Sequence, residues 1–190
     1  MAHKFDVKNK NKLDSAERRK ILPPEETLMK LGLDEGDRVA DIGCGIGYFS
    51  IPAAKIAGSR GYVFAFDISQ EMLKETLKRA TANNISNLHT ILIPENDIIF
   101  GEKVSFVLMS NLLHEIDNKL DMLRQARNIL RDKGRLAIVE WQKAETKYGP
   151  PIDHRIDKNE VVEMLAALGF NCINKFDIGE NFYGITAELV

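Results

Sequence analysis

Three glycines stand at alternating positions in residues 41–47, which read DIGCGIG. Residues 38–40, just before them, are typical of a strand, and a helical pattern begins at Tyr48. The glycines therefore lie in a strand-to-helix turn. Without Cβ atoms such a turn lets a ligand approach the backbone, and the first amides of the following helix point toward an anionic group. This stretch predicts a site for a small ligand.

The spacing of the glycines narrows the class of ligand. The dinucleotide fingerprint needs glycines at its first, third and sixth places. Counted from Gly43 the sixth place is Tyr48, and counted from Gly45 it is Ser50. A phosphate-binding loop would need Gly-Lys followed by Ser or Thr, and that triplet does not follow the turn. The spacing therefore disfavours a nicotinamide-dependent oxidoreductase.

Strand and helix patterns alternate along the chain. Strands are expected over residues 38–43, 62–66, 88–93, 104–109, 135–141, 171–178 and 182–190, and helices over 25–31, 48–57, 69–84, 119–131 and 158–168. Nearly continuous apolar strands suit a parallel sheet covered by helices on both faces. The short connection between the last two strands requires an antiparallel hairpin. The sequence therefore predicts an α/β fold with a Rossmann-like, doubly wound, mostly parallel seven-stranded sheet and a C-terminal antiparallel hairpin.

Composition excludes several classes of protein. The 190 residues, 44% of them apolar, suit one domain over residues 1–190. A net charge of −2 lacks the basic excess of proteins that wrap nucleic acid. The two cysteines, Cys44 and Cys172, predict no disulfide framework and no metal site. Because no apolar run approaches the roughly 18 residues of a membrane span and no signal peptide opens the chain, we expect a cytoplasmic protein.

An acid follows the second predicted strand. Asp67 comes 20 residues after Gly47, and the carboxyl ends of adjacent parallel strands form one crevice. A carboxylate at this place accepts hydrogen bonds from ribose hydroxyls. The alternative is that Asp67 caps the helix that begins near Ser69. Asp41, in contrast, is expected mainly to bond the amides of its own turn and so to shape the site.

Taken in order, these motifs resemble those of the class I S-adenosylmethionine-dependent methyltransferases. The resemblance rests on the glycine turn, Asp67, the loop at Glu95-Asn96, residues 110–115 (SNLLHE) and residues 130–136 (LRDKGRL). It covers about residues 24–141. Its small-molecule branch, which includes the ubiquinone/menaquinone-biosynthesis methyltransferases, is the most similar. The arsenite branch is disfavoured, because two cysteines are too few thiolates to hold the metalloid.

The resemblance implies S-adenosylmethionine as cofactor. The helix amides after the turn would face its methionine part, Asp67 its ribose, and the loop after the third strand its adenine. Pro94 stands in that loop where many relatives carry Asp, and an ordinary exposed loop is the alternative. The predicted cofactor-binding residues are Asp41, Gly43, Cys44, Gly45, Asp67, Ile68, Glu95, Asn96 and Asn111.

The methyl acceptor should lie over the carboxyl edge of the sheet. His114 is predicted to be catalytic, by removing a proton from the acceptor, and its alternatives are a structural role or a cofactor contact through Leu112. Residues 1–22, a basic segment, and the loop 142–157 are candidate covers, although the former also suits a mobile tail or an anion-binding arm. Trp141, Tyr148 and His154 are predicted to bind the acceptor. As alternatives, Trp141 belongs to the core and the others to a surface loop.

These observations predict a methyltransferase that moves a methyl group to a small molecule by in-line displacement. No Asn-Pro-Pro-Tyr or Asp-Pro-Pro-Tyr motif follows the fourth strand, so a nucleic-acid base is disfavoured as acceptor. The alternative is a sensor or a partner subunit that binds S-adenosylmethionine without turning it over. The sequence leaves the oligomeric state open.

Overall fold

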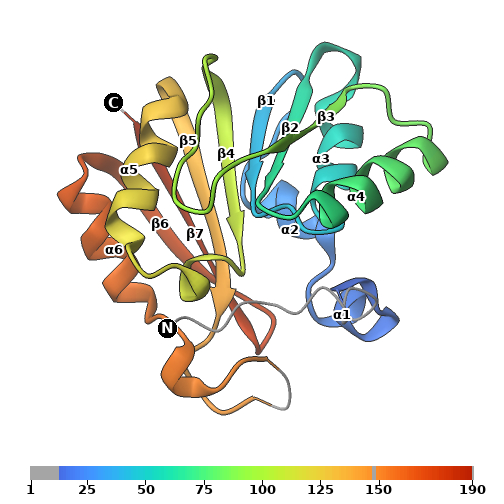
Figure 1. Cartoon of the computed structure of the whole chain (residues 1–190). Coiled ribbons are helices and arrows are strands. Elements are labelled where there is room, and N and C mark those ends of the chain that lie inside the picture. Colours follow the sequence, from blue (N-terminus) through green and yellow to red (C-terminus); the bar gives the residue numbers. More distant parts are fainter. Residues whose placement is uncertain (1–12, 147–148, 190) are drawn as a thin grey trace.

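The computed structural model describes residues 13–146 and 149–189, and its seven strands form one sheet (Figure 1). The strands are β1 (Arg38–Ile42), β2 (Tyr62–Asp67), β3 (Leu88–Leu92), β4 (Val104–Ser110), β5 (Leu130–Trp141), β6 (Phe170–Ile178) and β7 (Phe182–Leu189). Their order is β3-β2-β1-β4-β5-β7-β6. The first five strands are parallel to one another, and β7 is antiparallel to both β5 and β6. The predicted sheet and its terminal hairpin are confirmed.

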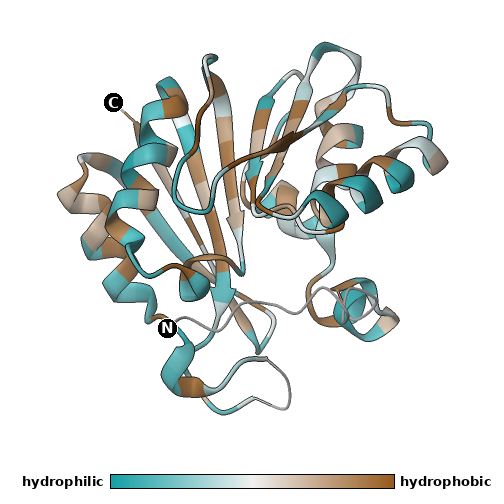
Figure 2. Cartoon of the chain, in the orientation of Figure 1, coloured by the Kyte–Doolittle hydropathy of each residue, from teal (hydrophilic) through white to brown (hydrophobic). Residues whose placement is uncertain are grey.

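Helices cover both faces of the sheet, as a doubly wound fold requires. Helices α2 (Pro24–Lys30), α3 (Ser50–Ala57) and α4 (Gln70–Ala82) lie on one face, and α5 (Lys119–Ile129) and α6 (Lys158–Ala167) lie on the other. Alternate residues of each strand point into two separate cores. Val107 packs in the core under α5, whereas Phe106 packs in the core under α3. Figure 2 shows apolar residues along the strands and polar residues on the outer sides of α4 and α5.

Short polar side chains begin several of these helices. The Ser69 hydroxyl accepts a hydrogen bond from the Met72 amide at the start of α4, and the Asp157 carboxylate accepts one from the Asn159 amide at the start of α6. Each cap satisfies an amide that has no partner within its helix. These caps fix where the helices leave the carboxyl edge of the sheet.

Several predicted boundaries were wrong. The helix expected over residues 119–131 ends at Ile129, and β5 begins at Leu130, which pairs with Val104. The largely polar residues 131–134 then lie in a bulge, and regular pairing resumes at Arg135, opposite Phe106. Lys133 has a positive φ of 57° within this bulge, and left-handed backbone ends a helical pattern. The helix expected from Tyr48 begins at Ser50, because the turn continues to that point.

The described part of the N-terminal segment, residues 13–21, has regular structure and lies against the body of the protein. They contain helix α1 (Ala16–Ile21), capped by the Ser15 hydroxyl, which accepts a hydrogen bond from the Arg18 amide. The ion pair between Asp14 and Arg79 of α4 holds the segment to the body of the protein. The prediction for residues 1–12 lies outside the described residues.

We expect Tyr183→Phe to lower the free energy of unfolding. The buried Tyr183 hydroxyl donates to the Ile156 carbonyl at 3.0 Å and so ties the end of the 142–157 loop to β7. Its loss leaves a buried carbonyl unpaired, which costs about 1–3 kcal/mol. Thermal unfolding should show a midpoint lower by several degrees, at roughly 2–4 °C per kcal/mol. Tyr62→Phe, at an exposed hydroxyl, is the control, and equal midpoints for the two variants would contradict the prediction.

Candidate functional site

The glycine turn joins β1 to α3 at the carboxyl edge of the sheet. Gly43, Gly45 and Gly47 have φ values of +75°, +55° and +77°, a region that side chains with a Cβ rarely adopt. Space is restricted as well. A Cβ on Gly43 would lie 2.9 Å from the Leu112 side chain, and one on Gly47 would lie 2.9 Å from that of Thr76. Only glycine fits this turn, and Leu112 brings the segment after β4 onto it.

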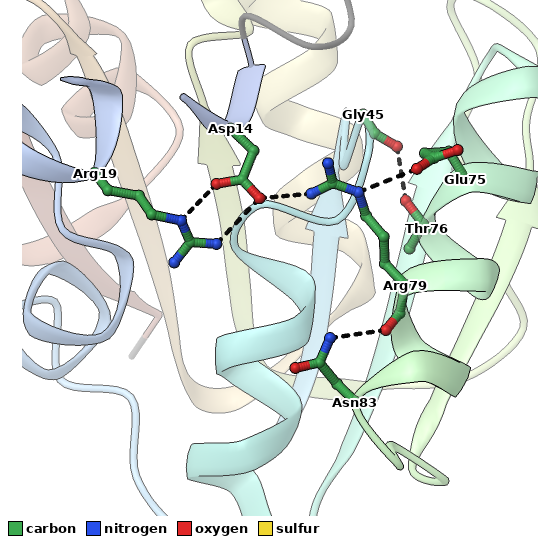
Figure 3. A network of polar contacts seen from close by, with 7 residues as sticks. All are labelled: Asp14, Arg19, Gly45, Glu75, Thr76, Arg79 and Asn83. Carbon is green, nitrogen blue, oxygen red and sulfur yellow. Dashed lines mark hydrogen bonds and ion pairs between the residues drawn. The ribbon is translucent and has the colours of Figure 1, made fainter. Parts of the chain in front are cut away.

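Two side chains hold the peptide groups of Gly45 from opposite sides. The Gly45 amide donates to Asp67 Oδ2 at 2.8 Å, and the Thr76 hydroxyl donates to the Gly45 carbonyl at 2.8 Å (Figure 3 shows the second bond). Thr76 is fully buried and was missed by the sequence analysis. The only indication in the sequence was that Thr76 is a polar residue on the apolar face of the predicted helix. The turn is therefore fixed by both β2 and α4.

Asp67 lies at the end of β2, beside the turn, as predicted. Its Oδ1 accepts the Ser69 amide at 2.8 Å, so the expected helix-start contact is present too. Burial raises the pKa of Asp67, although the hydrogen bonds from the Ser69, Gly45 and Ile68 amides oppose this shift. A carboxylate offers about four lone-pair positions. The three amides occupy at most three of them, which leaves acceptor capacity for a hydroxyl group in the crevice.

The contact expected of Asp41 was wrong in its partner. The Asp41 carboxylate accepts a hydrogen bond from the Ser50 hydroxyl at 2.5 Å, whereas the Gly43 and Cys44 amides donate to the Phe66 carbonyl, each at 2.9 Å. The Phe66 carbonyl of β2 is therefore the acceptor for amides that were expected to bond Asp41. Asp41 is 2% exposed, and burial, together with the nearby charge of Asp67, raises its pKa to about 7 against the opposing hydrogen bond from Ser50.

The loop after β3 comes to the same end of β2. The Ile93 amide donates to the Asp67 carbonyl at 3.1 Å. Gln125 of α5 fixes the loop from its other side, because its amide group bonds the Asn96 carbonyl and the Ile98 amide, both at 2.6 Å. Glu95 and Asn96 are exposed, and Ile68 is 47% exposed. Ile68, directly after Asp67, thus offers an exposed apolar surface, and the loop adds exposed polar side chains.

A buried pair of a carboxylate and an imidazole, Glu140 and His114, lies at the same edge of the sheet as the glycine turn. His114 lies in a short 3-10 helix, η3 (Leu113–Glu115), and its Nδ1 is 2.8 Å from Oε2 of Glu140 in β5. The Glu140 side chain is 1% exposed and that of His114 is 8% exposed. Burial alone would lower the pKa of His114, but the charge and hydrogen bond of Glu140 outweigh it and raise the pKa. The sequence analysis missed Glu140 as the partner of His114.

Asn111 directly follows β4 and is bonded to β5. Its backbone has a positive φ of 51°, and its amide donates to the Val139 carbonyl at 2.7 Å. Its side-chain Oδ1 is buried and has no hydrogen-bond partner among the described residues. A buried acceptor of this kind normally has a donor. A ligand ammonium or hydroxyl group would supply one.

The loop 142–157 packs on Trp141. The Trp141 ring lies 4.2 Å from the Phe182 ring, and a Cβ on Gly149 would come within 2.8 Å of it. The Arg155 guanidinium lies 5.5 Å from the Trp141 ring and donates to carbonyls of the loop, those of Gln142, Ala144 and Pro150. Arg155 therefore links separate parts of the loop to one another.

The remaining residues predicted to bind the acceptor divide between the surface and the part that is not described. The side chain of His154 is 40% exposed and its Nε2 is 3.9 Å from Asp153. Tyr148 lies outside the described residues. Within residues 13–146 and 149–189 no cluster of three His, Cys, Asp or Glu side chains could hold a metal ion, and no helix is long and apolar enough to cross a membrane.

Comparison with known proteins places the chain in a family. The family model described as a methyltransferase domain matches residues 33–181, well over half of the chain. A solved structure, an S-adenosylmethionine-dependent methyltransferase from Aquifex aeolicus, is similar with a TM-score of 0.92 and 29% identity, covering 98% of this chain and 100% of that one. The protein belongs to the methyltransferase-domain family.

Relatives in sequence match shorter parts. Demethylmenaquinone methyltransferase from Listeria welshimeri is 28% identical over 121 residues, which are 61% of this chain and 50% of that protein. The chain therefore spans about half the length of this curated relative. The 23S rRNA (uracil(1939)-C(5))-methyltransferase RlmD from Acinetobacter baumannii is 40% identical over 55 residues, 29% of this chain and 12% of that protein.

We expect the stability of the protein to fall as the pH rises from about 4 to about 7, and Asp41→Asn to flatten this dependence. Because burial raises the pKa of Asp41 from 3.8 to about 7, the folded state keeps a proton in this range that the unfolded chain releases. The linked loss is about 2–4 kcal/mol. Chemical denaturation across the range measures it, with Asp132→Asn, at an exposed carboxylate, as the control. An equal slope in Asp41→Asn and the wild type would refute the linkage.

We expect Asp67→Ala to weaken binding of S-adenosylhomocysteine by about ten- to hundredfold, because a charge-assisted hydrogen bond contributes roughly 1.5–3 kcal/mol. Titration calorimetry measures the affinity, and circular dichroism confirms that the variant is folded. Asp132→Ala is the control. Unchanged affinity in a folded Asp67→Ala variant would remove Asp67 from the ribose site.

Proposed function

We propose that the protein is an S-adenosylmethionine-dependent methyltransferase that acts on a small-molecule acceptor by in-line displacement. Family membership and the similar Aquifex aeolicus structure support the reaction class. The observation that carries the proposal is the packing of Leu112 on Gly43. It brings the His114–Glu140 pair to the same sheet edge as the glycine turn and Asp67.

The residues at this edge fit the proposed cofactor. S-adenosylmethionine supplies a methyl group on a sulfonium, which is already a good leaving group. Asp67 would accept bonds from the ribose hydroxyls, and the N-terminal amides of α3 would face the methionine carboxylate. The buried Oδ1 of Asn111 would accept a bond from the methionine ammonium. Ile68, Glu95 and Asn96 would contact the adenine.

The protein then mainly has to align the acceptor and exclude water. His114 is proposed as the base that takes the acceptor proton. Glu140 holds Nδ1, so that Nε2 is the nitrogen available to the acceptor, and its charge stabilises the imidazolium that forms. Trp141 and His154 are proposed as walls of the acceptor site, with the 142–157 loop as its cover.

A small molecule is favoured over nucleic acid as acceptor. The Listeria welshimeri relative is named for a demethylmenaquinone substrate and matches 61% of this chain, whereas the rRNA methyltransferase matches 29%. The net charge of −2 also gives no electrostatic attraction to phosphates. The alternative, a sensor that binds the cofactor without turnover, shares the turn and Asp67 but has no use for the His114–Glu140 pair.

Ligand-dependent thermal unfolding tests the cofactor, and methyl transfer tests the catalysis. A ligand at about a hundred times its dissociation constant stabilises by about 2.7 kcal/mol, so S-adenosylmethionine and S-adenosylhomocysteine should raise the midpoint by several degrees and reduced nicotinamide dinucleotide should not. Labelled methyl transfer to a panel of phenols, quinols, thiols and amines would then identify the acceptor class. Binding of both sulfur nucleosides with no transfer to any small acceptor would favour the sensor.

We expect His114→Gln to lower kcat for an acceptor that must lose a proton by about a hundredfold or more, the typical loss of a general base. Glu140→Gln should move the acid limb of the kcat/KM profile to lower pH. The base must be neutral, and removal of the Glu140 charge lowers the pKa of His114. Initial rates across pH measure both effects, with His89→Gln as the control. A profile unaltered in Glu140→Gln would exclude His114 as the base.

A further inference from the structure

Residues 13–22, here called the strap, lie against the glycine turn and the helix that follows it. The Leu13 side chain comes within 3.7 Å of the place where a Cβ on Gly45 would stand. Further along the strap, the Arg18 guanidinium lies 4.7 Å from the ring of Tyr48, the residue that follows the turn. The Tyr48 hydroxyl donates to the Leu22 carbonyl at 2.6 Å. The start of the strap thus contacts the turn at Gly45, and its later residues contact Tyr48, just after the turn.

The Asp14 carboxylate holds the N-terminal end of the strap (Figure 3). Asp14 accepts two bonds from Arg19 of α1, at 2.6 and 3.1 Å, and a third from Arg79 of α4 at 2.6 Å. Arg79 is held in place by Glu75, one turn earlier on α4, at 3.3 Å. The side chain of Asp14 is 13% exposed and that of Arg79 is 28% exposed. This contact spans 65 residues of sequence and joins the strap to the body of the protein.

The helix that binds the strap also binds the turn. Thr76 of α4 donates to the Gly45 carbonyl, and Arg79 lies one turn further along the same helix (Figure 3). The Asp14–Arg79 pair therefore holds the strap against Gly45, the residue that Thr76 and Asp67 bond. Leu13, next to Asp14, is the side chain that this closure brings to Gly45.

The closure is of a kind that opens easily. Helix α1 has six residues, none of them fully buried. Its last residue, Ile21, packs against the core under α3, and ion pairs and ring contacts hold the part nearer Asp14. Partly exposed ion pairs contribute little to stability and are screened by salt. Leu22, in contrast, is fully buried, and Pro23 and Pro24 follow it with restricted backbone. The strap therefore has one firm end at Leu22 and one weakly held end at Asp14.

We propose that the strap forms the outer wall of the cofactor site and that Asp14 is its latch on Arg79, which slows departure of the cofactor. Asp14 acts through Arg79 and Leu13 and is a positioning residue. The inference rests on the proposed cofactor. Cofactor bound at the turn would contact the strap and favour its closed position, and the closed strap would retain the cofactor, since the coupling is reciprocal.

The dissociation rate of S-adenosylhomocysteine tests the latch, measured by stopped-flow displacement in the wild type and in Asp14→Asn. We expect Asp14→Asn to raise the rate by about three- to tenfold, the range of a partly exposed ion pair to a charged hydrogen bond. Arg79→Gln should do the same, and the double variant should be no faster than either single one. Glu188→Gln, which breaks the Arg135–Glu188 pair of the β5–β7 ladder, is the matched control and should not change the rate.

Limited trypsin digestion reads the strap directly, because Arg18, Arg19 and Lys20 are cleavage sites within it. Saturating S-adenosylhomocysteine should slow cleavage there in the wild type, and Asp14→Asn should speed it even without ligand. Bound ligand with neither protection nor a faster dissociation in Asp14→Asn would overturn the latch alone. A wild type that does not bind S-adenosylhomocysteine would overturn the proposed function and this inference with it.

Discussion

The peptide groups of Gly45 are the point on which the site depends. Its amide is bonded by Asp67, at the end of β2, and its carbonyl by Thr76, inside α4. A glycine at φ +55° has little conformational preference of its own, so these two bonds select its conformation. The turn therefore takes its shape only when β1, β2 and α4 have assembled. A local sequence motif gets its geometry from contacts 22 and 31 residues away.

The fold was predictable because its signals are local. Apolar runs marked the strands, Gly and Pro marked most helix ends, and the short connection before Phe182 required the hairpin. The positions of Asp67 and of the turn followed from sheet topology alone. The bulge that starts β5 was not predictable, since it depends on pairing between Val104 and Leu130 across the sheet. The polar contacts were hidden for the same reason. Glu140 looks like an ordinary acid near a strand end until His114 is placed beside it.

Three buried carboxylates, Asp41, Asp67 and Glu140, are concentrated at one edge of the sheet. A buried charge is costly unless fixed groups replace the water it loses. Asp67 receives backbone amides and Glu140 an imidazole, which makes both well-oriented acceptors. Asp41 has only the Ser50 hydroxyl among these contacts, and its raised pKa follows from that difference. The edge is thus organised before any ligand arrives, which is what alignment of two reactants requires.

The two segments proposed as covers of this edge, the strap and the 142–157 loop, differ in the contacts that hold them. Arg155, only 5% exposed, donates to three carbonyls of the 142–157 loop and packs over Trp141. These are charge-assisted bonds, and breaking them would cost the guanidinium three carbonyl partners. The strap, in contrast, depends on Asp14, whose arginine partners reach solvent. Opening it exposes groups that water can solvate. Of the two, we therefore expect the strap to open more readily, so that exchange of the proposed cofactor at the glycine turn would not require the loop on Trp141 to unfold.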